Sequence, residues 1–243
     1  MKNTNKTPEE ALIRIFINDA FFSSLLCTPQ DTKELTIGWL FNQGNMESMA
    51  EVSSIETSDD SRDIKIGLTT DNYKETDRNN VIRTVACMGG EISFHQFFKN
   101  RTKLTTDLTV TMADLKDLMK ASLSLTRLYK ESGGIHCAAL ASPSDKQIVT
   151  GFEDVGRHNA VDKVIGSMLL NSRAMTDKVL LTSGRISSEM ALKAANGKIP
   201  VIATITACTD LAVNIADAAG LTVVGRVLSA SPKVWCGEER IKK

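Results

Sequence analysis

The second half of the chain alternates short apolar strands with amphipathic helices, and this pattern constrains the fold more than any other feature of the sequence. Strand candidates cover residues 148–152, 178–182, 200–206 and 221–227, and helix candidates between them cover 159–170, 187–196 and 209–219. Strands that alternate with helices of this length form crossover units on a parallel sheet. The pattern therefore predicts an α/β fold built on a largely parallel sheet.

The first part of the chain has a different pattern. An apolar strand over 13–17 is followed by the turn Asn18-Asp19 and a partner strand over 21–26, which predicts a hairpin. The run from Thr28 to Asp31 has a proline near its first turn and an acid close behind, so it predicts a helix start, and the helix should end near Gly44. Short strands with polar turns are expected over 51–85.

A second helix start lies at Thr111, because Asp114 stands three residues later in the position of a capping-box acid. We place the domain boundary just before this helix. Residues 1–108 are expected to form a smaller N-terminal α+β subdomain that ends in a loop around Cys87, and residues 109–243 to form the α/β domain.

Composition excludes several classes of function. Lysine plus arginine and aspartate plus glutamate both number 29, and aromatic residues make up only 5% of the chain, so neither a basic nucleic-acid surface nor base-stacking platforms are expected. No apolar run approaches the roughly 20 residues of a membrane helix, and the polar N-terminus has no apolar signal core. These features predict a cytoplasmic protein without nucleic-acid or membrane partners.

The cysteines point to the same compartment. There are five, Cys27, Cys87, Cys137, Cys208 and Cys236, and no two form a C-x-x-C pair. An odd number of widely spaced cysteines argues against a disulfide framework and against a structural zinc site, and favours a reducing environment. Three scattered histidines supply no metal site without help from cysteines, so no bound metal is expected.

Three loops follow strand candidates and lead into helices, which is where ligands bind in open α/β sheets. They cover 153–159, 183–189 and 206–210. The first contains Gly156 and Arg157, and the second Gly184 and Arg185, so each offers close backbone approach, a permanently charged guanidinium and a helix N-terminus. These loops predict phosphate binding. The alternative is that the two arginines pair with nearby acids such as Asp154 and Glu189.

Two histidines and one cysteine stand next to glycine turns. His136 follows Gly133-Gly134 and His158 follows Gly156-Arg157, so each is a candidate for orienting a ligand or moving a proton, or else is a structural side chain. Cys87 precedes Gly89-Gly90, which favours an exposed turn and a reactive thiol. An ordinary glycine turn with a free cysteine is the alternative there.

Several of these segments together resemble the FdhD family, the sulfurtransferases that serve formate dehydrogenase. The run 152–166, FEDVGRHNAVDKVIG, is similar to the family's first signature, and 183–190, SGRISSEM, to its second. The segment 132–136, SGGIH, resembles its Gly-Gly-x-His motif. Residues 39–44 and 219–225 look like its N-terminal helix end and its last strand, so the resemblance covers nearly the whole chain.

The resemblance implies a specific activity. Family members accept sulfur from a cysteine desulfurase as a persulfide and pass it to the molybdenum of a bis(guanylyl molybdopterin) cofactor before that cofactor enters formate dehydrogenase. It also implies a homodimer and a C-terminal domain with the three-layer αβα fold of cytidine deaminase. Deaminase chemistry is not expected, because His136-Cys137-Ala138 lacks the glutamate of the zinc motif.

The resemblance also assigns roles to residues. Cys87 would carry the persulfide, and the cofactor, or GDP as its mimic, would bind at two sets of residues. The first set is His136, Gly156, Arg157, His158, Gly184, Arg185 and Ser187. The second is the C-terminal segment Arg226, Val227, Leu228, Ser229, Ala230 and Ser231.

The sequence departs from the family pattern in its central loop, where Gly90 occupies the place of a second cysteine. A chaperone that binds and delivers the molybdenum cofactor without transferring sulfur is therefore the alternative function. A dithiol redox protein is a weaker third possibility, since the chain has no vicinal cysteine pair.

Overall fold

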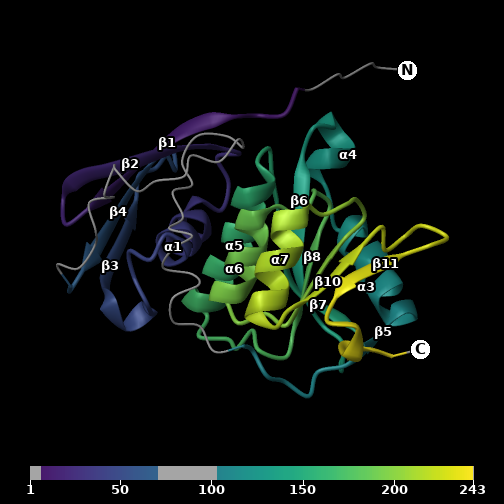
Figure 1. Cartoon of the computed structure of the whole chain (residues 1–243). Helices are drawn as coiled ribbons and strands as arrows, with labels where there is room; N and C mark the ends of the chain where they lie inside the picture. Colours follow the sequence, from purple (N-terminus) through teal and green to yellow (C-terminus); the bar gives the residue numbers. More distant parts are fainter. Residues whose placement is uncertain (1–6, 71–102, 243) are drawn as a thin grey trace, which may run out of the picture.

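A computed structural model describes residues 7–70 and 103–242, and Figure 1 shows them as two lobes. We call residues 7–70 the N-terminal lobe and residues 103–242 the C-terminal lobe. The last part of the segment 51–85, where short strands are expected, and the Cys87 loop lie outside the described residues.

The N-terminal lobe is a four-stranded sheet with one helix on its inner face (Figure 1). The strand order is β2-β1-β4-β3, in which β1 and β4 are parallel and the other pairs antiparallel. Alternate residues of β1 are buried, as expected for a strand with one face against a core. The predicted hairpin and the helix after it are confirmed. The elements are β1 (Ala11–Ile17), β2 (Ala20–Cys27), α1 (Thr32–Asn42), η1 (Met49–Glu51), β3 (Val52–Thr57) and β4 (Asp63–Leu68).

The C-terminal lobe is built on a six-stranded sheet with the order β11-β10-β9-β8-β6-β7. Its strands are β6 (His136–Ser142), β7 (Gln147–Asp154), β8 (Val179–Thr182), β9 (Val201–Thr204), β10 (Thr222–Gly225) and β11 (Lys233–Cys236). Its helices are α3 (Met112–Ser124), α4 (Leu128–Ser132), α5 (Arg157–Leu170), α6 (Ser188–Asn196), α7 (Asp210–Ala219) and η2 (Glu238–Arg240). A two-stranded sheet pairs β5 (Val110–Thr111) with β12 (Ile241–Lys242).

Helices cover both faces of this sheet. One core cluster joins the sheet to α5, α6 and α7, and a second joins its other face to α3. The architecture is therefore mixed α/β, as predicted. The cap at Thr111 is confirmed as well, since its hydroxyl accepts a hydrogen bond from the Asp114 amide at 3.0 Å.

The expectation of a largely parallel sheet is wrong, because only the β8-β9 and β9-β10 pairs are parallel. The four predicted strands, β7 to β10, run in the same direction, but β6 lies between β7 and β8 and is antiparallel to both. At the other end of the sheet, β11 is antiparallel to β10. The β6 segment is rich in alanine and has no β-branched residue in its buried run, so its composition carries no strand signal.

The two lobes meet where α1 packs on α5, and Figure 1 shows α1 between the N-terminal sheet and the C-terminal helices. A glycine from each helix permits this crossing. A Cβ atom on Gly38 would lie well inside contact distance of the Asp162 carbonyl oxygen, and one on Gly166 would meet the Glu34 carbonyl oxygen in the same way. The helix backbones therefore touch without intervening side chains.

Buried charges lie beside this crossing. The Lys163 Nζ and an Asp154 carboxylate oxygen are 2.7 Å apart, and neither side chain has any exposed surface. Lys193 pairs with Asp162, whose other carboxylate oxygen accepts a hydrogen bond of 2.7 Å from the Asn42 side chain of α1. Within residues 7–70 and 103–242, no helix has the length and apolarity to cross a membrane.

We predict that Gly38→Ala and Gly166→Ala each lower the free energy of unfolding by about 3 kcal/mol or more, because the added methyl group must push two helix backbones apart. Urea denaturation measures the loss. Gly197→Ala is the matched control, since its Cβ would come no closer than 3.3 Å to a flexible Ile199 side chain. A Gly38→Ala protein as stable as the control would contradict the close crossing.

Candidate functional site

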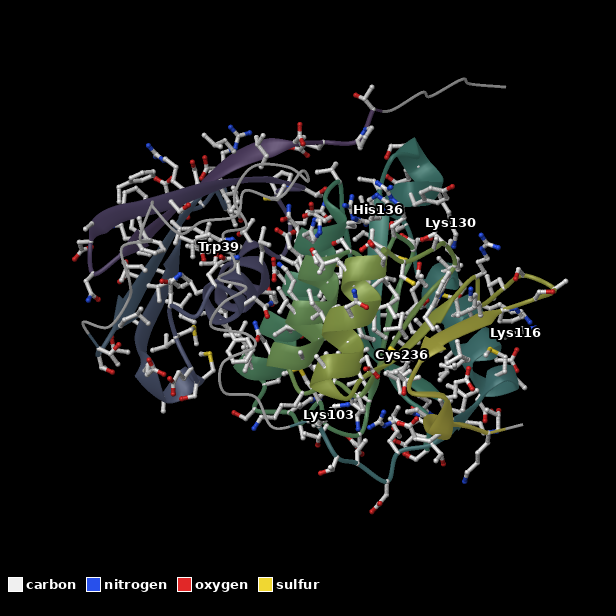
Figure 2. All side chains as sticks on the ribbon, viewed as in Figure 1. Trp39, Lys103, Lys116, Lys130, His136 and Cys236 are labelled. Carbon is white, nitrogen blue, oxygen red and sulfur yellow. The ribbon has the colours of Figure 1, made fainter. Side chains whose placement is uncertain are left out.

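The predicted loops meet at one edge of the C-terminal sheet. Strands β7, β8, β9 and β10 all end at this edge, and β6 begins there with His136 paired to Asp154. Figure 2 shows His136 at this edge and Cys236, beside the first residues of β10, toward the opposite one. The topology therefore brings together loops that are as much as 90 residues apart in the sequence, from His136 to Arg226.

The two Gly-Arg loops are in direct contact. Gly156 is the N-cap of α5, and Arg157 and His158 occupy its first turn, while Ser187 is the N-cap of α6. The Arg157 side chain lies against Gly184, where a Cβ atom would come within 2.8 Å of its Cδ. His158 Nε2 lies 3.1 Å from the Ser187 hydroxyl. Two helix N-termini, each with free amide groups, therefore face the same region.

Both site histidines have lowered pKa values. Burial, followed by the charge of Arg157, lowers the pKa of His136. Burial, followed by Lys193, Arg157 and His136, lowers the pKa of His158 to about 2. His158 Nε2 lies 3.0 Å from a buried Glu189 carboxylate oxygen, which by itself would favour the imidazolium. The surrounding positive charges and the lack of water outweigh that single carboxylate, so the neutral ring donates its Nε2–H to it.

Ser183 is a site residue that sequence reasoning missed. Its hydroxyl accepts a hydrogen bond from the Cys137 amide at 3.0 Å and lies 3.3 Å from His136 Nδ1. It therefore fixes both the first turn after β8 and the orientation of the His136 ring. Its place beside Gly184 in the predicted loop was the only signal available.

The β9 loop is tied to the same edge by hydroxyl groups. Thr204 donates to the Gly184 carbonyl oxygen at 2.6 Å and lies 2.9 Å from the Thr206 hydroxyl. The Ile186 amide donates to the Ala207 carbonyl oxygen, and the Thr209 amide returns a hydrogen bond to Ile186. The loops after β8 and β9 consequently form one connected surface.

The C-terminal segment 226–231 begins at this edge as well. Arg226 is exposed, has a φ of 54°, and its amide donates to the Thr206 carbonyl oxygen at 2.7 Å. Leu228, Ser229, Ala230 and Ser231 are exposed too. Val227 differs from them, because its side chain is completely buried in the core against α3. The Val227 side chain is therefore unavailable to a ligand, whereas its neighbours reach solvent.

Each of the two acids named as alternative partners of the arginines has a further partner in the structure. Asp154 forms its buried ion pair with Lys163, and Glu189 faces His158. Arg185 is exposed, and Arg157 is partly buried against Gly184.

The burial of Lys163 and Lys193 was not predicted, because a lysine in a helix normally indicates a solvated face.

Four of the five cysteines lie in the described residues, and all are free thiols. Burial raises the pKa of each one, to about 12 for Cys27 and about 11 for Cys236. Cys137 and Cys208 are shifted in the same direction, also chiefly by burial. The fifth, Cys87, lies outside the described residues. In the part of the chain that the structure describes, no group of three or more histidine, cysteine or acidic side chains is placed to hold a metal.

Comparison with known proteins gives this site a context. The model of the FdhD/NarQ family matches residues 8–242. The chain belongs to the FdhD/NarQ family. Both Gly-Arg loops, the Gly-Gly-x-His segment and the C-terminal segment lie within the matched range.

Curated relatives and a solved structure agree with this assignment. A protein named sulfur carrier protein FdhD from Sulfolobus acidocaldarius is 34% identical over 235 residues, which cover 96% of this chain and 89% of the relative. Its namesake from Geobacillus kaustophilus is 31% identical over 94% of this chain and 87% of the relative. A Desulfotalea psychrophila crystal structure, described as that of a formate dehydrogenase accessory protein, has a TM-score of 0.79 and 27% identity, covering 97% of this chain and 90% of its own.

We predict that stability falls as the pH is lowered from 7 toward 5. His158 has a lowered pKa in the folded protein, so the unfolded chain binds its proton more readily below about pH 6.5, at a cost of up to about 2 kcal/mol near pH 5. Urea denaturation at several pH values measures the slope. His158→Gln keeps a donor toward Glu189 and should make the slope shallower. An unchanged slope would mean that His158 has the same pKa in the folded and unfolded protein.

Proposed function

We propose that this protein is a cytoplasmic sulfur carrier that accepts sulfur from a cysteine desulfurase and passes it to a bis(guanylyl molybdopterin) molybdenum cofactor. The cofactor is its substrate, and formate dehydrogenase is the enzyme that receives the product. The relatives' names, sulfur carrier and formate dehydrogenase accessory protein, support this class of function. The proposal includes a homodimer. It also includes a C-terminal lobe with the fold of cytidine deaminase, and the mixed sheet with helices on both faces supports that fold.

The observation that carries this proposal is the meeting of both family signatures at one edge of the sheet. Each signature supplies a helix N-terminus and an arginine, and the Arg157 side chain rests on the glycine of the other loop. Helix N-termini and guanidinium groups both favour phosphate. A pyrophosphate-linked guanine nucleotide, the outer part of the proposed cofactor, has the charge that such a surface binds. Exposed residues of 226–231 would extend the same surface.

The cysteines support Cys87 as the sulfur carrier. Persulfide chemistry needs a thiolate, and a thiol with a raised pKa supplies very little of it at neutral pH. Burial raises the pKa of Cys27, Cys137, Cys208 and Cys236. By elimination among the five cysteines, and by its match to the family's carrier, Cys87 is the proposed nucleophile. With Gly90 at the second family position, we propose a single-thiol carrier whose persulfide persists until an acceptor takes the sulfur.

We predict that GDP binds as a partial mimic of the cofactor, and that Arg157→Ala or Arg185→Ala weakens its binding about tenfold or more. Loss of one charge-assisted hydrogen bond costs roughly 1.5–3 kcal/mol, which corresponds to that factor. Calorimetry measures the affinity. Arg173→Ala is the matched control, because Arg173 is exposed beyond the far end of α5. Equal affinity in all three variants would remove both loops from the site.

We predict that Cys87→Ser abolishes sulfur loading by a desulfurase and cysteine but leaves GDP affinity nearly unchanged. Intact-mass analysis detects the loading as one added sulfur atom. Cys137→Ser, Cys208→Ser and Cys236→Ser should each load normally, since their thiols have raised pKa values. If Cys87→Ser still supports formate dehydrogenase maturation at the normal level, the chaperone function replaces the carrier function.

A further inference from the structure

We propose that Thr28, a residue of the N-terminal lobe, is a positioning residue for the anion-binding loop 154–159 of the C-terminal lobe. Occupancy of that loop and the placement of the N-terminal lobe are therefore linked. The inference rests on the proposed binding of an anionic nucleotide at the Gly-Arg loops. The N-terminal lobe would thus contribute to nucleotide binding, although none of its residues is proposed to contact the ligand.

Thr28 follows directly after β2 and makes three hydrogen bonds across the lobe boundary. Its hydroxyl oxygen accepts a hydrogen bond from the Val155 amide at 3.1 Å, and its own amide donates to the Asp154 carboxylate at 3.2 Å. Its carbonyl oxygen accepts one from Lys163 Nζ at 3.3 Å. Thr28 is only 2% exposed, so water cannot readily take over these hydrogen bonds.

The Asp154 carboxylate connects Thr28 to the loop through hydrogen bonds. One of its oxygens meets Thr28 and Lys163, while the other accepts hydrogen bonds from the Gly156 amide at 2.8 Å and the Asn159 side chain at 3.0 Å. Gly156 and Asn159 bracket the first turn of α5. The Asp154 carboxylate therefore orients the first turn of α5, whose backbone amides would bind an anion, and the N-terminal lobe holds that carboxylate in place.

A second contact ties the same loop to the N-terminal lobe. The Asn159 side chain also donates to the Leu26 carbonyl oxygen at 2.8 Å, so the end of β2 touches the far side of the same turn. The loop is held at both ends against one short stretch of the N-terminal lobe. Coupling between binding and lobe placement is reciprocal by thermodynamic necessity. Because Cys87 follows this lobe along the chain, occupancy of the anion site would be communicated to the part of the protein that precedes the sulfur carrier.

Asp154 variants are a poor test, because they leave Lys163 buried without a counter-charge and are expected to unfold. Thr28→Val has nearly the same shape but leaves the Val155 amide without its acceptor, and Thr28→Ser restores the hydroxyl. Thr36→Val is the matched control. Thr36 is a buried threonine of the same lobe whose hydroxyl bonds within α1, to the Thr32 carbonyl oxygen at 2.8 Å.

Calorimetry with GDP and amide hydrogen exchange of the ligand-free protein form the two arms of the test. We expect Thr28→Val to weaken GDP binding about five- to tenfold and to speed exchange over residues 156–160, while Thr28→Ser and Thr36→Val stay within about twofold of the wild type. In the wild type, GDP should slow exchange over residues 26–30 as well as in the loop. This last measurement needs no variant.

The results of these experiments decide whether Thr28 positions the loop. The inference is overturned if Thr28→Val matches Thr36→Val in affinity and in loop exchange, or if GDP protects the loop and leaves residues 26–30 unchanged. If the wild type binds no GDP, the proposed nucleotide site fails, whereas the exchange of ligand-free Thr28→Val still tests whether Thr28 positions the loop. Restored affinity in Thr28→Ser separates the hydroxyl's role from a general loss of stability.

Discussion

The contact between the α1 and α5 backbones is the constraint on which the rest of the structure depends. Gly38 and Gly166 let the two helices touch, because any side chain at either position would collide with the opposite backbone. This short separation brings Asn42 onto Asp162 and the end of β2 onto Asp154. Asn42 and Thr28 reach these carboxylates because the two helices lie this close together.

The same contact explains why two lysines lie in the interior. Removing a charge from water costs several kcal/mol, and only a close, fully hydrogen-bonded partner offsets it. Lys163 meets this condition, since Asp154 and the carbonyl oxygens of Thr28 and Glu153 surround its ammonium group. Such a pair adds little net stability but tolerates few alternative arrangements. It therefore fixes how the loop before α5 sits relative to the N-terminal lobe.

The sequence predicted the elements whose signals are local. Helix α5 was expected over 159–170 and begins only two residues earlier, and the turn at Asn18-Asp19 and the cap at Thr111 are where local chemistry requires them. Strand β6 was missed because alanine favours no strand. The hydrogen bond between Thr28 and Asp154 joins residues 126 positions apart, so no local pattern indicates it. The site's loops were found from glycine and arginine, while the residues that orient them were not.

The positive charge at the candidate site comes from groups that do not change protonation near neutral pH. Arginine stays protonated at any physiological pH, so Arg157 and Arg185 supply positive charge that does not titrate. Burial lowers the pKa values of His136 and His158, helped by Arg157 at both rings and by Lys193 at His158, which leaves both rings neutral and able to donate or accept hydrogen bonds. Anion affinity would then vary little across neutral pH. A carrier that must hold an anionic substrate while a thiolate reacts benefits from that separation, because protonation changes that affect the thiol leave the anion-binding groups unchanged.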